Sequence, residues 1–269
     1  MSPDAIIASL RDIVAQARPV VMAGVGSGLT AAGAANGGAH LIAAYSTAVY
    51  RCRGLPSVLS FLPYDNANDL AFSVAADVVE QAGACPVILG LGVHDPRAAV
   101  DGLLDRVEAF GAVGIMNEPF VGMYSAEIRA DLDTAGFGFR REVALVERAA
   151  TRNMLAYAWA FTPDEARKMV GSGARVVGAM LGPSRDDDSA LERALAEADA
   201  IAEAALASDP DVIVLAHGGP LTTPKIVREF LLRSACHGYA TGSSAERRPV
   251  IEAVAEAVRR FGAPLREQR

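Results

Sequence analysis

The stretch Cys236-His-Gly-Tyr-Ala-Thr-Gly-Ser-Ser-Ala-Glu-Arg-Arg-Pro249 predicts a strand that runs directly into a turn and a helix. Its segment Gly238 to Thr241 is short, apolar and partly aromatic, which is typical of a buried strand. Pro249 suits the first turn of the helix that follows, because that position has no need of a backbone N–H. The order strand, turn, helix is the repeating unit of an α/β fold.

The turn in this stretch predicts an anion-binding site. Gly242 lets a ligand approach the backbone closely, and Ser243 and Ser244 are expected to cap the helix. Unpaired N–H groups at a helix N-terminus attract anions, and Arg247 would add a full positive charge beside them.

The same alternation continues outward through the whole chain, and Gly238 to Thr241 is the last of eight predicted strands. A length of 269 residues suits one (β/α)8 barrel, for which ~250 residues are typical. We therefore predict an α/β fold with a single (β/α)8 TIM barrel rather than an open doubly wound sheet. The other seven predicted strands are Val20 to Gly26, His40 to Ser46, Cys85 to Val93, Ala112 to Met116, Asn153 to Phe161, Arg175 to Leu181 and Asp211 to Ala216.

The segments around these strands complete one predicted domain over 1–269, with a helix over 1–18, the barrel over 19–262 and a tail over 263–269. The first helix is amphipathic and is expected to close the N-terminal end of the barrel. Residues 47–65 form a long predicted connection, which we expect to be functional. His94-Asp95-Pro96 is expected to cap a helix, and Asp186 to Ser189 to begin a long Ala-rich helix that reaches Ser208.

Composition restricts the class of protein. With 51% hydrophobic residues, 25 Gly and a net charge of −7, the chain is typical of a packed enzyme-like domain and unlike a nucleic-acid binder. Three widely spaced cysteines favour neither a disulfide framework nor a zinc site. No apolar run is long enough for a membrane span. We expect a cytoplasmic protein that forms a homo-oligomer and binds neither nucleic acid nor membrane.

The active site of a TIM barrel lies at the C-terminal ends of its strands, so the residues at those ends are the candidates. Two other histidines, His40 and His237, fall at strand beginnings and are predicted to be structural. The predicted strand ends and the loop beyond the second strand supply Gly26, Ser27, Gly28, Tyr45, Asp65, His94, Asp95, Asn117, Glu118, His217, Ser243 and Ser244.

Among these candidates, His217 is the predicted general acid or base, because Gly218 and Gly219 after it let the backbone bend around a ligand. Glu118 and Asp65 suit proton transfer or a divalent metal. Arg51 is a candidate clamp for a carboxylate or phosphate.

Two common cofactors are not predicted. Gly26-Ser27-Gly28 is too short for a dinucleotide fingerprint, so NAD is not expected. Lys168 and Lys225 both fall in predicted helices, which disfavours a Schiff base and pyridoxal phosphate.

An ordered set of motifs along nearly the whole chain resembles the phosphoenolpyruvate hydrolase-like TIM-barrel family. The motifs are Gly24-Val-Gly-Ser-Gly-Leu-Thr30, Tyr50-Arg51, Leu62-Pro-Tyr64 with Ala67-Asn68, Asp95-Pro96, Glu142-Val143, His217-Gly-Gly-Pro220 and Ser243-Ser-x-Glu-Arg-x-Pro249. This family is related to the phosphoenolpyruvate mutase and isocitrate lyase superfamily. The resemblance adds Glu142 to the candidate catalytic residues.

The resemblance implies an enzyme that uses Mg²⁺ or another divalent metal, held by Asp65 and Asp95, to act on a small anionic 2-oxo acid or phosphorylated or phosphonate compound. The implied step breaks a C–C, P–C or P–O bond through an enolate-like intermediate. The chain departs from the family pattern at Pro63-Tyr-Asp-Asn-Ala-Asn68, where the acidic residue stands one place earlier. A metal-independent lyase or isomerase and a non-catalytic anion- or nucleotide-binding regulatory barrel are the alternatives.

Overall fold

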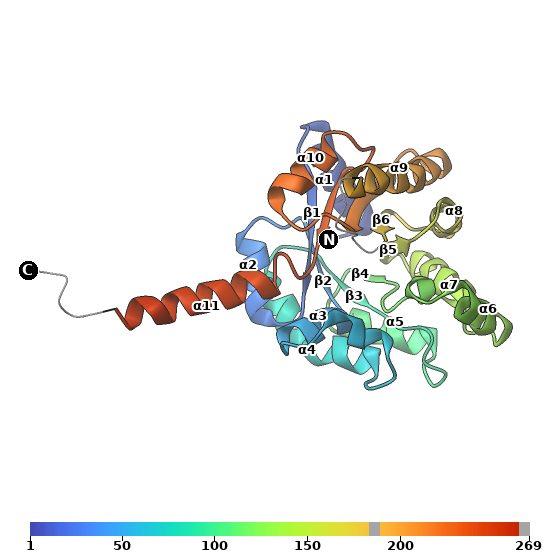
Figure 1. Ribbon diagram of the computed structural model, residues 1–269. Helices are drawn as coiled ribbons and strands as arrows, with labels where there is room; N and C mark the ends of the chain where they lie inside the picture. The colour runs from blue at the N-terminus through green and yellow to red at the C-terminus, as the bar shows by residue number, and fades with distance from the viewer. Residues whose placement is uncertain (183–188, 264–269) are drawn as a thin grey trace, which may run out of the picture.

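The computed structural model describes residues 1–182 and 189–263, and its strands form a closed barrel, as predicted. Each strand is parallel to the next along the chain, and β8 pairs with β1 to close the barrel, with Gly238 opposite Val20 (Figure 1). The strands are β1 Val20–Val25, β2 Leu41–Ala44, β3 Val87–Gly90, β4 Gly114–Met116, β5 Leu155–Ala160, β6 Val176–Leu181, β7 Ile213–Gly218 and β8 Gly238–Thr241.

Helices follow the strands and form the outer layer of the barrel (Figure 1). The α-helices are α1 Pro3–Ala15, α2 Gly28–Asn36, α3 Ser46–Cys52, α4 Ala67–Ala82, α5 Val100–Ala109, α6 Ala126–Thr134, α7 Phe139–Thr151, α8 Pro163–Gly171, α9 Ala190–Ser208, α10 Pro224–Leu231 and α11 Arg247–Phe261, and the 3₁₀ helices are η1 Ser57–Phe61 and η2 Val121–Met123.

The N-terminal helix α1 closes one end of the barrel. Its buried residues Ile6, Ile7 and Leu10 belong to one hydrophobic cluster with the first residues of several strands, among them Val20 and Leu155. That cluster continues through the barrel interior to Tyr157 and Trp159, whose rings lie 4.9 Å apart. The C-terminal ends of the strands therefore lie at the opposite end of the barrel.

Two histidines stabilise strand beginnings at the end of the barrel near α1. His40 Nδ1 accepts a hydrogen bond from Val21 N at 2.9 Å, and His237 Nδ1 accepts one from Val214 N at 3.0 Å. Each ring thus accepts a hydrogen bond from a backbone N–H group of a neighbouring strand. The predicted structural role of the two histidines agrees with these contacts.

The segment 47–65, predicted to be a long connection, contains regular structure instead. Helix α3 begins at Ser46, immediately after Tyr45, and η1 follows it. A helix here puts one face of the segment against the barrel, so that Tyr50 and Arg51 are buried.

The helix predicted to be capped by His94-Asp95-Pro96 begins later, at Val100, and Ala99 is its N-cap. The reason is local: Asp95 accepts hydrogen bonds from Arg97 N and from the Arg97 side chain, which holds the chain in a turn before the helix. Residues 186–188 of the start predicted for the long Ala-rich helix lie outside the described residues, and α9 follows from Ala190 to the predicted end.

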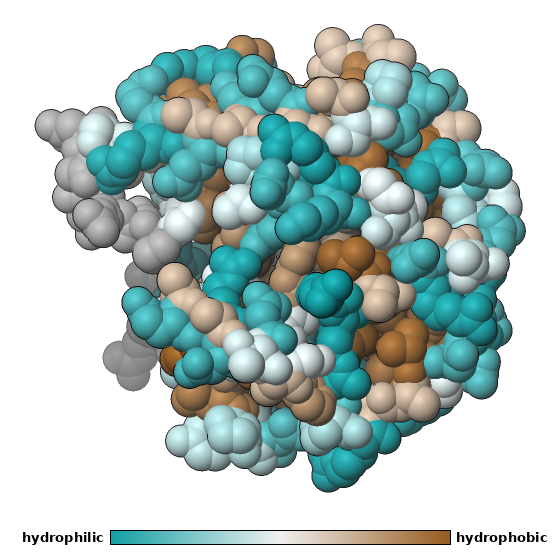
Figure 2. All heavy atoms as spheres, turned by 90° about the vertical axis from the view of Figure 1, so that its right-hand side faces the viewer, coloured by the Kyte–Doolittle hydropathy of each residue, from teal (hydrophilic) through white to brown (hydrophobic). Residues whose placement is uncertain are grey.

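The last helix, α11, leaves the barrel and extends away from it (Figure 1), and none of its residues is buried. On the side of the barrel to the right in Figure 1, hydrophilic side chains cover most of the surface and hydrophobic ones lie in smaller patches between them (Figure 2). None of the described helices is long and apolar enough to cross a membrane.

Candidate active site

A buried ion pair joins α3 to the beginning of α11. Arg51 Nε donates to Glu246 Oε2 at 2.8 Å, and both side chains are only 3% exposed. Arg51 Nη2 donates to Gly24 O at 3.1 Å and lies 3.4 Å from the Tyr45 hydroxyl. Arg51 Nη1 makes no hydrogen bond within the described part of the chain.

The carboxylate of Glu246 occupies the turn between β1 and α2, not the turn after β8 that the sequence predicts to bind an anion. Its Oε1 accepts hydrogen bonds from Gly26 N at 2.7 Å and from Thr30 Oγ1 at 2.9 Å. Gly26 is required here because a Cβ at this position would lie 2.2 Å from the Ala48 carbonyl oxygen, inside the backbone of α3. An anion of the protein itself therefore satisfies this turn.

Glu118, at the end of β4, is the second buried carboxyl group of the site. It is 3% exposed and accepts hydrogen bonds from Ser46 Oγ at 3.3 Å and from Thr47 Oγ1. Burial raises the pKa of Glu118 to about 7, against the opposing effects of the Thr47 hydrogen bond and the charge of Arg51. A carboxyl group with this pKa can donate or accept a proton near neutral pH.

His217, in the penultimate position of β7, presents one free ring nitrogen. Its Nδ1 lies 2.6 Å from Ala240 O, and a carbonyl oxygen only accepts, so Nδ1 carries the proton. Burial lowers the pKa of His217, which keeps the ring neutral at pH 7. Nε2 has no hydrogen-bond partner among the described residues and is left as a proton acceptor.

Arg51 and His217 meet at Gly242, beyond the end of β8. A Cβ at Gly242 would lie 3.2 Å from His217 Cε1 and 3.8 Å from Arg51 Nη1. The missing side chain thus leaves space beside the two groups. Arg51 also acts electrostatically on both Glu118 and His217, so one cation serves both candidate acid–base residues.

Aromatic rings fill the region beside this site. The ring of Trp159 lies 5.3 Å from that of His217 and 6.2 Å from that of Phe120, and Phe61 and Phe161 also pack on Phe120. Trp159 Nε1 is buried without a hydrogen-bond partner in the described structure. These rings make one side of the site apolar, which is consistent with the raised pKa of Glu118.

Glu142, the third candidate catalytic residue, supports the loop after β4 from α7. Its carboxylate accepts hydrogen bonds from Val121 N at 2.8 Å and Asn117 Nδ2 at 2.5 Å, and it lies 3.1 Å from His94 Nε2. Asn117 in turn accepts a hydrogen bond from Trp159 N at 2.7 Å. Glu142 therefore contacts Asn117, which directly precedes Glu118 in the chain and binds the backbone of Trp159.

The two candidate metal ligands are each engaged by neighbouring side chains. Asp65 accepts a hydrogen bond from Tyr50 at 2.7 Å and is 44% exposed. Asp95 binds Asn66 and Arg97, and hydrogen bonds from Arg97 lower its pKa. No group of three or more His, Cys, Asp or Glu side chains suited to a metal ion occurs in the ranges 1–182 and 189–263. The donor set around Asp65 and Asp95 thus does not fit a divalent metal.

The remaining candidates lie around the same mouth in other roles. Ser27 caps α2, which begins at Gly28, and Gly218 and Gly219 both have positive φ, at 91° and 54°. The predicted cap by Ser243 and Ser244 is wrong, because Glu246 is the N-cap of α11 and Ala245 N donates to Gly242 O. Arg247 lies at the surface, where it donates to Leu55 O at 3.3 Å.

The sequence reasoning missed four residues of this site: Glu246, Ser46, Thr47 and Trp159. Glu246 is the glutamate of the motif Ser243-Ser-x-Glu-Arg, which the sequence analysis quotes. The analysis expected a ligand to supply the negative charge of this site and Arg247 to supply the positive charge, so it gave Glu246 no role. Trp159 is the single tryptophan of the chain and lies one residue before the end of β5, which was an available signal.

The fold and this mouth define a (β/α)8 barrel with a buried cation and two acid–base groups at the C-terminal ends of its strands. A profile of the family described as phosphoenolpyruvate hydrolase-like matches residues 5–263. The chain belongs to that family, as the motifs predicted.

Curated relatives include the ToMV susceptible protein tm-1(GCR26) of Solanum lycopersicum, 32% identical over 263 residues, which are 95% of this chain and 35% of the relative. Another is the putative transcriptional regulatory protein y4pA of Sinorhizobium fredii (strain NBRC 101917 / NGR234), 30% identical over 253 residues, which are 91% of this chain and 41% of the relative. The chain thus spans well under half the length of these relatives.

Solved structures of similar fold include a phosphonopyruvate hydrolase in complex with oxalate and Mg²⁺, with a TM-score of 0.63 and 16% identity, covering 100% of this chain and 90% of that one. They also include 2,3-dimethylmalate lyase, a PEP mutase/isocitrate lyase superfamily member, with a TM-score of 0.59, 16% identity and coverage of 100% and 92%. At this identity the likeness establishes the fold.

The buried ion pair gives a first prediction. Arg51→Met should lower the free energy of unfolding by about 3–5 kcal/mol, because it leaves Glu246 buried without its partner. The double variant Arg51→Met/Glu246→Gln should lose less than the sum of the two single variants. Urea unfolding at pH 7 measures this coupling, and the exposed pair Arg167–Asp164, also at 2.8 Å, is the control with little coupling expected. If the losses of unfolding free energy at Arg51 and Glu246 were additive, the two side chains would not be coupled, and the assignment of a stabilising buried ion pair would be wrong.

Glu118 gives a second prediction, on the pH dependence of stability. Its pKa rises from 4.5 to about 7 on folding, so its contribution to stability is full below pH 4.5 and is lost as the pH rises through 7. Glu118→Gln should therefore match the parent near pH 4.5 and be more stable at pH 8, by up to about 3 kcal/mol. Denaturant unfolding at both pH values tests this, with the exposed Glu203→Gln as control. If variant and parent were equally stable at pH 8, the ionisation of Glu118 would not lower the free energy of unfolding, and the prediction would be wrong.

Proposed function

We propose that this chain is an enzyme that acts on a small anionic 2-oxo acid or a phosphorylated or phosphonate compound and cleaves it through an enolate-like intermediate. The observation that carries the proposal is Glu118, a buried carboxyl group with a pKa of about 7 in the same mouth as the buried cation Arg51. Perturbed carboxyl groups in a partly apolar cleft are typical of catalytic acids and bases.

Arg51 is the proposed anion-binding residue. Its Nε and Nη2 are fixed by Glu246 and Gly24, so the guanidinium is already oriented when a ligand arrives. Its Nη1 borders the open space at Gly242, where it can donate to a carboxylate or phosphoryl oxygen. A preoriented cation in a dry site stabilises negative charge without reorganisation during the reaction.

His217 and Glu118 divide the proton transfers between them. In a C–C cleavage, His217 Nε2 takes the proton of a substrate hydroxyl, and the C–C bond electrons pass to the leaving carbon. Arg51 stabilises the resulting enolate, and protonated Glu118 donates its proton to that carbon. In a hydrolysis, His217 Nε2 takes the proton of the attacking water instead. The water oxygen bonds to the phosphorus or carbonyl carbon, and the electrons of the bond that breaks pass to the leaving enolate. Ser46 and Thr47 hold the Glu118 carboxyl group in place for either reaction.

A non-catalytic regulatory barrel is the second candidate. Glu246 already satisfies Gly26 N and one edge of Arg51, so part of the predicted anion-binding surface is filled by the chain itself. One relative is described as a putative transcriptional regulatory protein, which agrees with this alternative. Ligand binding without turnover would support it.

The proposed roles yield a prediction on pH dependence. The reaction needs His217 neutral and Glu118 protonated, so the rate should rise as pH passes the lowered pKa of His217 and fall above about pH 7. Turnover of a panel of 2-oxo acids and 2-hydroxy dicarboxylic acids, followed by NMR in D₂O, measures the profile.

Glu118→Gln or His217→Gln should each reduce the rate by roughly 10²-fold or more. Arg247→Met, at a partly exposed arginine, is the control for Arg51→Lys, and only the latter should lose substrate affinity.

Two outcomes would overturn these roles. Near-normal turnover by His217→Gln with an unchanged pH profile would show that this histidine is structural, and Glu142 would then be tested. The absence of turnover across the whole panel, together with anion binding at Arg51, would favour the regulatory barrel.

A further prediction concerns the metal. Because Asp65 and Asp95 are engaged by Tyr50, Asn66 and Arg97, we expect turnover to persist in EDTA. Asp95→Asn should likewise leave the rate within about twofold, since no proposed step passes through it. The measurement is the rate with EDTA and with added Mg²⁺. Loss of turnover in EDTA that Mg²⁺ restores would contradict the prediction and assign a metal to this mouth.

A further inference from the structure

A row of buried hydroxyl groups leads from Glu118 to the 3₁₀ helix η1. Thr47 Oγ1, in the first turn of α3, contacts Glu118 Oε1 on one side and Ser60 Oγ at 2.6 Å on the other. Ser60 Oγ in turn contacts Ser57 O at 2.9 Å. Thr47 is 9% exposed and Ser60 is 8% exposed, so water has little access to either hydroxyl. We call this row, from Glu118 through Thr47 and Ser60 to Ser57 O, the hydroxyl chain.

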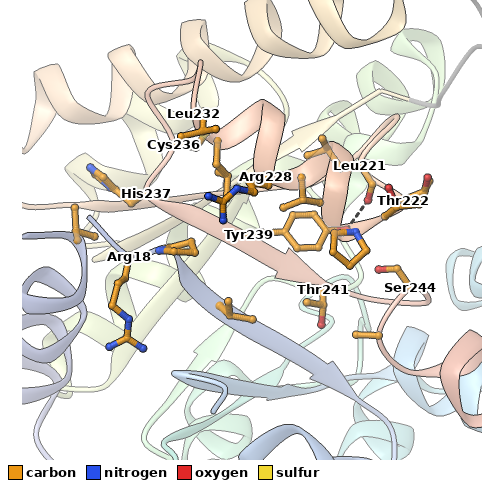
Figure 3. Close-up of a pocket in the computed structure, with 18 of the residues that line it drawn as sticks. Arg18, Leu221, Thr222, Arg228, Leu232, Cys236, His237, Tyr239, Thr241 and Ser244 are labelled. Atoms are coloured by element: carbon orange, nitrogen blue, oxygen red, sulfur yellow. Dashed lines mark hydrogen bonds between the residues drawn. The ribbon is translucent and has the colours of Figure 1, made fainter. Parts of the chain in front are cut away.

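The number of protons in the hydroxyl chain can be counted, because each hydroxyl group supplies one proton and a carbonyl oxygen supplies none. The hydroxyl of Tyr239, in β8, shows the simple case, since its one proton is donated to Leu221 O at 2.7 Å (Figure 3). The hydroxyl chain at Glu118 is different. It has three contacts, and its two hydroxyl groups supply only two protons.

The third proton belongs on Glu118. In the ionised form, Thr47 donates to Glu118, so the Thr47–Ser60 contact needs the proton of Ser60. Ser60 then has no proton left for Ser57 O. If Oε1 of Glu118 carries a proton, it donates to Thr47, and Thr47 donates to Ser60. Ser60 is then free to donate to Ser57 O. The three contacts occur together only in the protonated form.

The other groups around Glu118 leave this count unchanged. Ser46 Oγ donates to the second carboxyl oxygen, Oε2, at 3.3 Å. The charge of Arg51 favours the ionised form, and burial of the carboxyl group outweighs it. Tyr45 stays neutral because burial raises its pKa. From β3, Gly90 faces Glu118 and carries no side chain. The proton count and the burial of the carboxyl group therefore favour the same protonation state.

We propose that Ser60 is a positioning residue that holds the proton on Oε1 of Glu118 through Thr47. When Glu118 gives this proton to a substrate, the hydroxyl protons of Thr47 and Ser60 both turn toward the new carboxylate. Ser57 O then loses its bond from Ser60, so η1 responds to the protonation state of Glu118. The inference rests on the proposed function, in which Glu118 is the proton donor, and deepens it, but the hydroxyl chain is tested without a substrate.

Carbon-13 NMR of the side-chain carboxyl groups measures the pKa of Glu118, with Glu118→Gln used to assign its signal. Ser60→Ala should lower this pKa by roughly one pH unit, because it removes two hydrogen bonds from the protonated form and one from the ionised form. Ser46→Ala should raise the pKa, because a hydroxyl donates more strongly to a carboxylate than to a neutral carboxyl group. Ser57→Ala is the matched control, since only its backbone oxygen belongs to the hydroxyl chain.

The carbonyl carbon of Ser57 gives a second readout. Its chemical shift should change with pH at the same midpoint as the Glu118 carboxyl signal, and this change should disappear in Ser60→Ala. A role of Ser60 in packing alone would not give a shared midpoint. Once a substrate is found, the pH above which the rate falls should move down in Ser60→Ala and up in Ser46→Ala.

Three results would overturn the inference. One is a parent Glu118 that titrates near its ordinary value of 4.5. Another is a pKa of Glu118 that Ser60→Ala leaves unchanged or raises. The third is an equal change in Ser57→Ala, which would assign the effect to η1 as a whole. Far-UV circular dichroism checks that the variants fold, and if Ser60→Ala does not, the Ser57 signal of the parent and Ser46→Ala decide. The expected shifts without turnover of any substrate would support the hydroxyl chain and reject the proposed catalysis.

Discussion

The buried contact between Arg51 and Glu246 is the constraint on which the arrangement of the mouth depends. It joins residues 195 positions apart and fixes the first turn of α2, the end of α3 and the start of α11 relative to one another. Removing two charges from water is costly, and the cost is offset only when each charge is well hydrogen-bonded. Here Gly24 O, Gly26 N and Thr30 Oγ1 supply those additional bonds, so the pair holds a cation in a dry site even without a ligand.

Three buried glutamates have different roles because their partners differ. Glu246 faces a guanidinium, and Glu142 accepts from backbone and amide N–H groups, so each is a fixed acceptor. Glu118 is held by the hydroxyl groups of Ser46 and Thr47, which can donate or accept, and by the Thr47 backbone N–H. Burial outweighs these contacts and the charge of Arg51 and raises the pKa of Glu118 to about 7, so both of its protonation states are accessible near neutral pH.

The fold could be predicted from the sequence because each strand is a short, nearly continuous apolar run between polar turns. Most predicted strands extend one to three residues beyond the observed ones, as at Cys85 to Val93, where β3 is Val87–Gly90. The seventh strand is the exception at its end, because β7 continues two residues past the predicted Ala216, to Gly218. Helix α3 was missed because seven residues are too few to show a helical period. As a result, Arg51 was placed in a loop, although α3 buries it.

The site could be predicted only in part. Glu118 and His217 were found because strand ends point to the mouth of a barrel, and Arg51 because the long connection after the second strand was expected to be functional. Glu246 could not be assigned, because its partners come from residues 26, 30 and 51, and no local pattern reveals that proximity. Asp65 and Asp95 were chosen for their carboxylates, their places after predicted strands and the family resemblance, but their neighbours Tyr50 and Arg97 engage them.

The two histidines at the strand beginnings give the end of the barrel opposite the mouth a sensitivity to acid. His40 and His237 serve as hydrogen-bond acceptors through Nδ1, and a protonated imidazole has no acceptor nitrogen. Burial lowers the pKa of both rings, so their contribution to stability is complete above pH 6.5 and is lost as the pH falls through the lowered values. Mild acid should therefore loosen the seams between β1 and β2 and between β7 and β8.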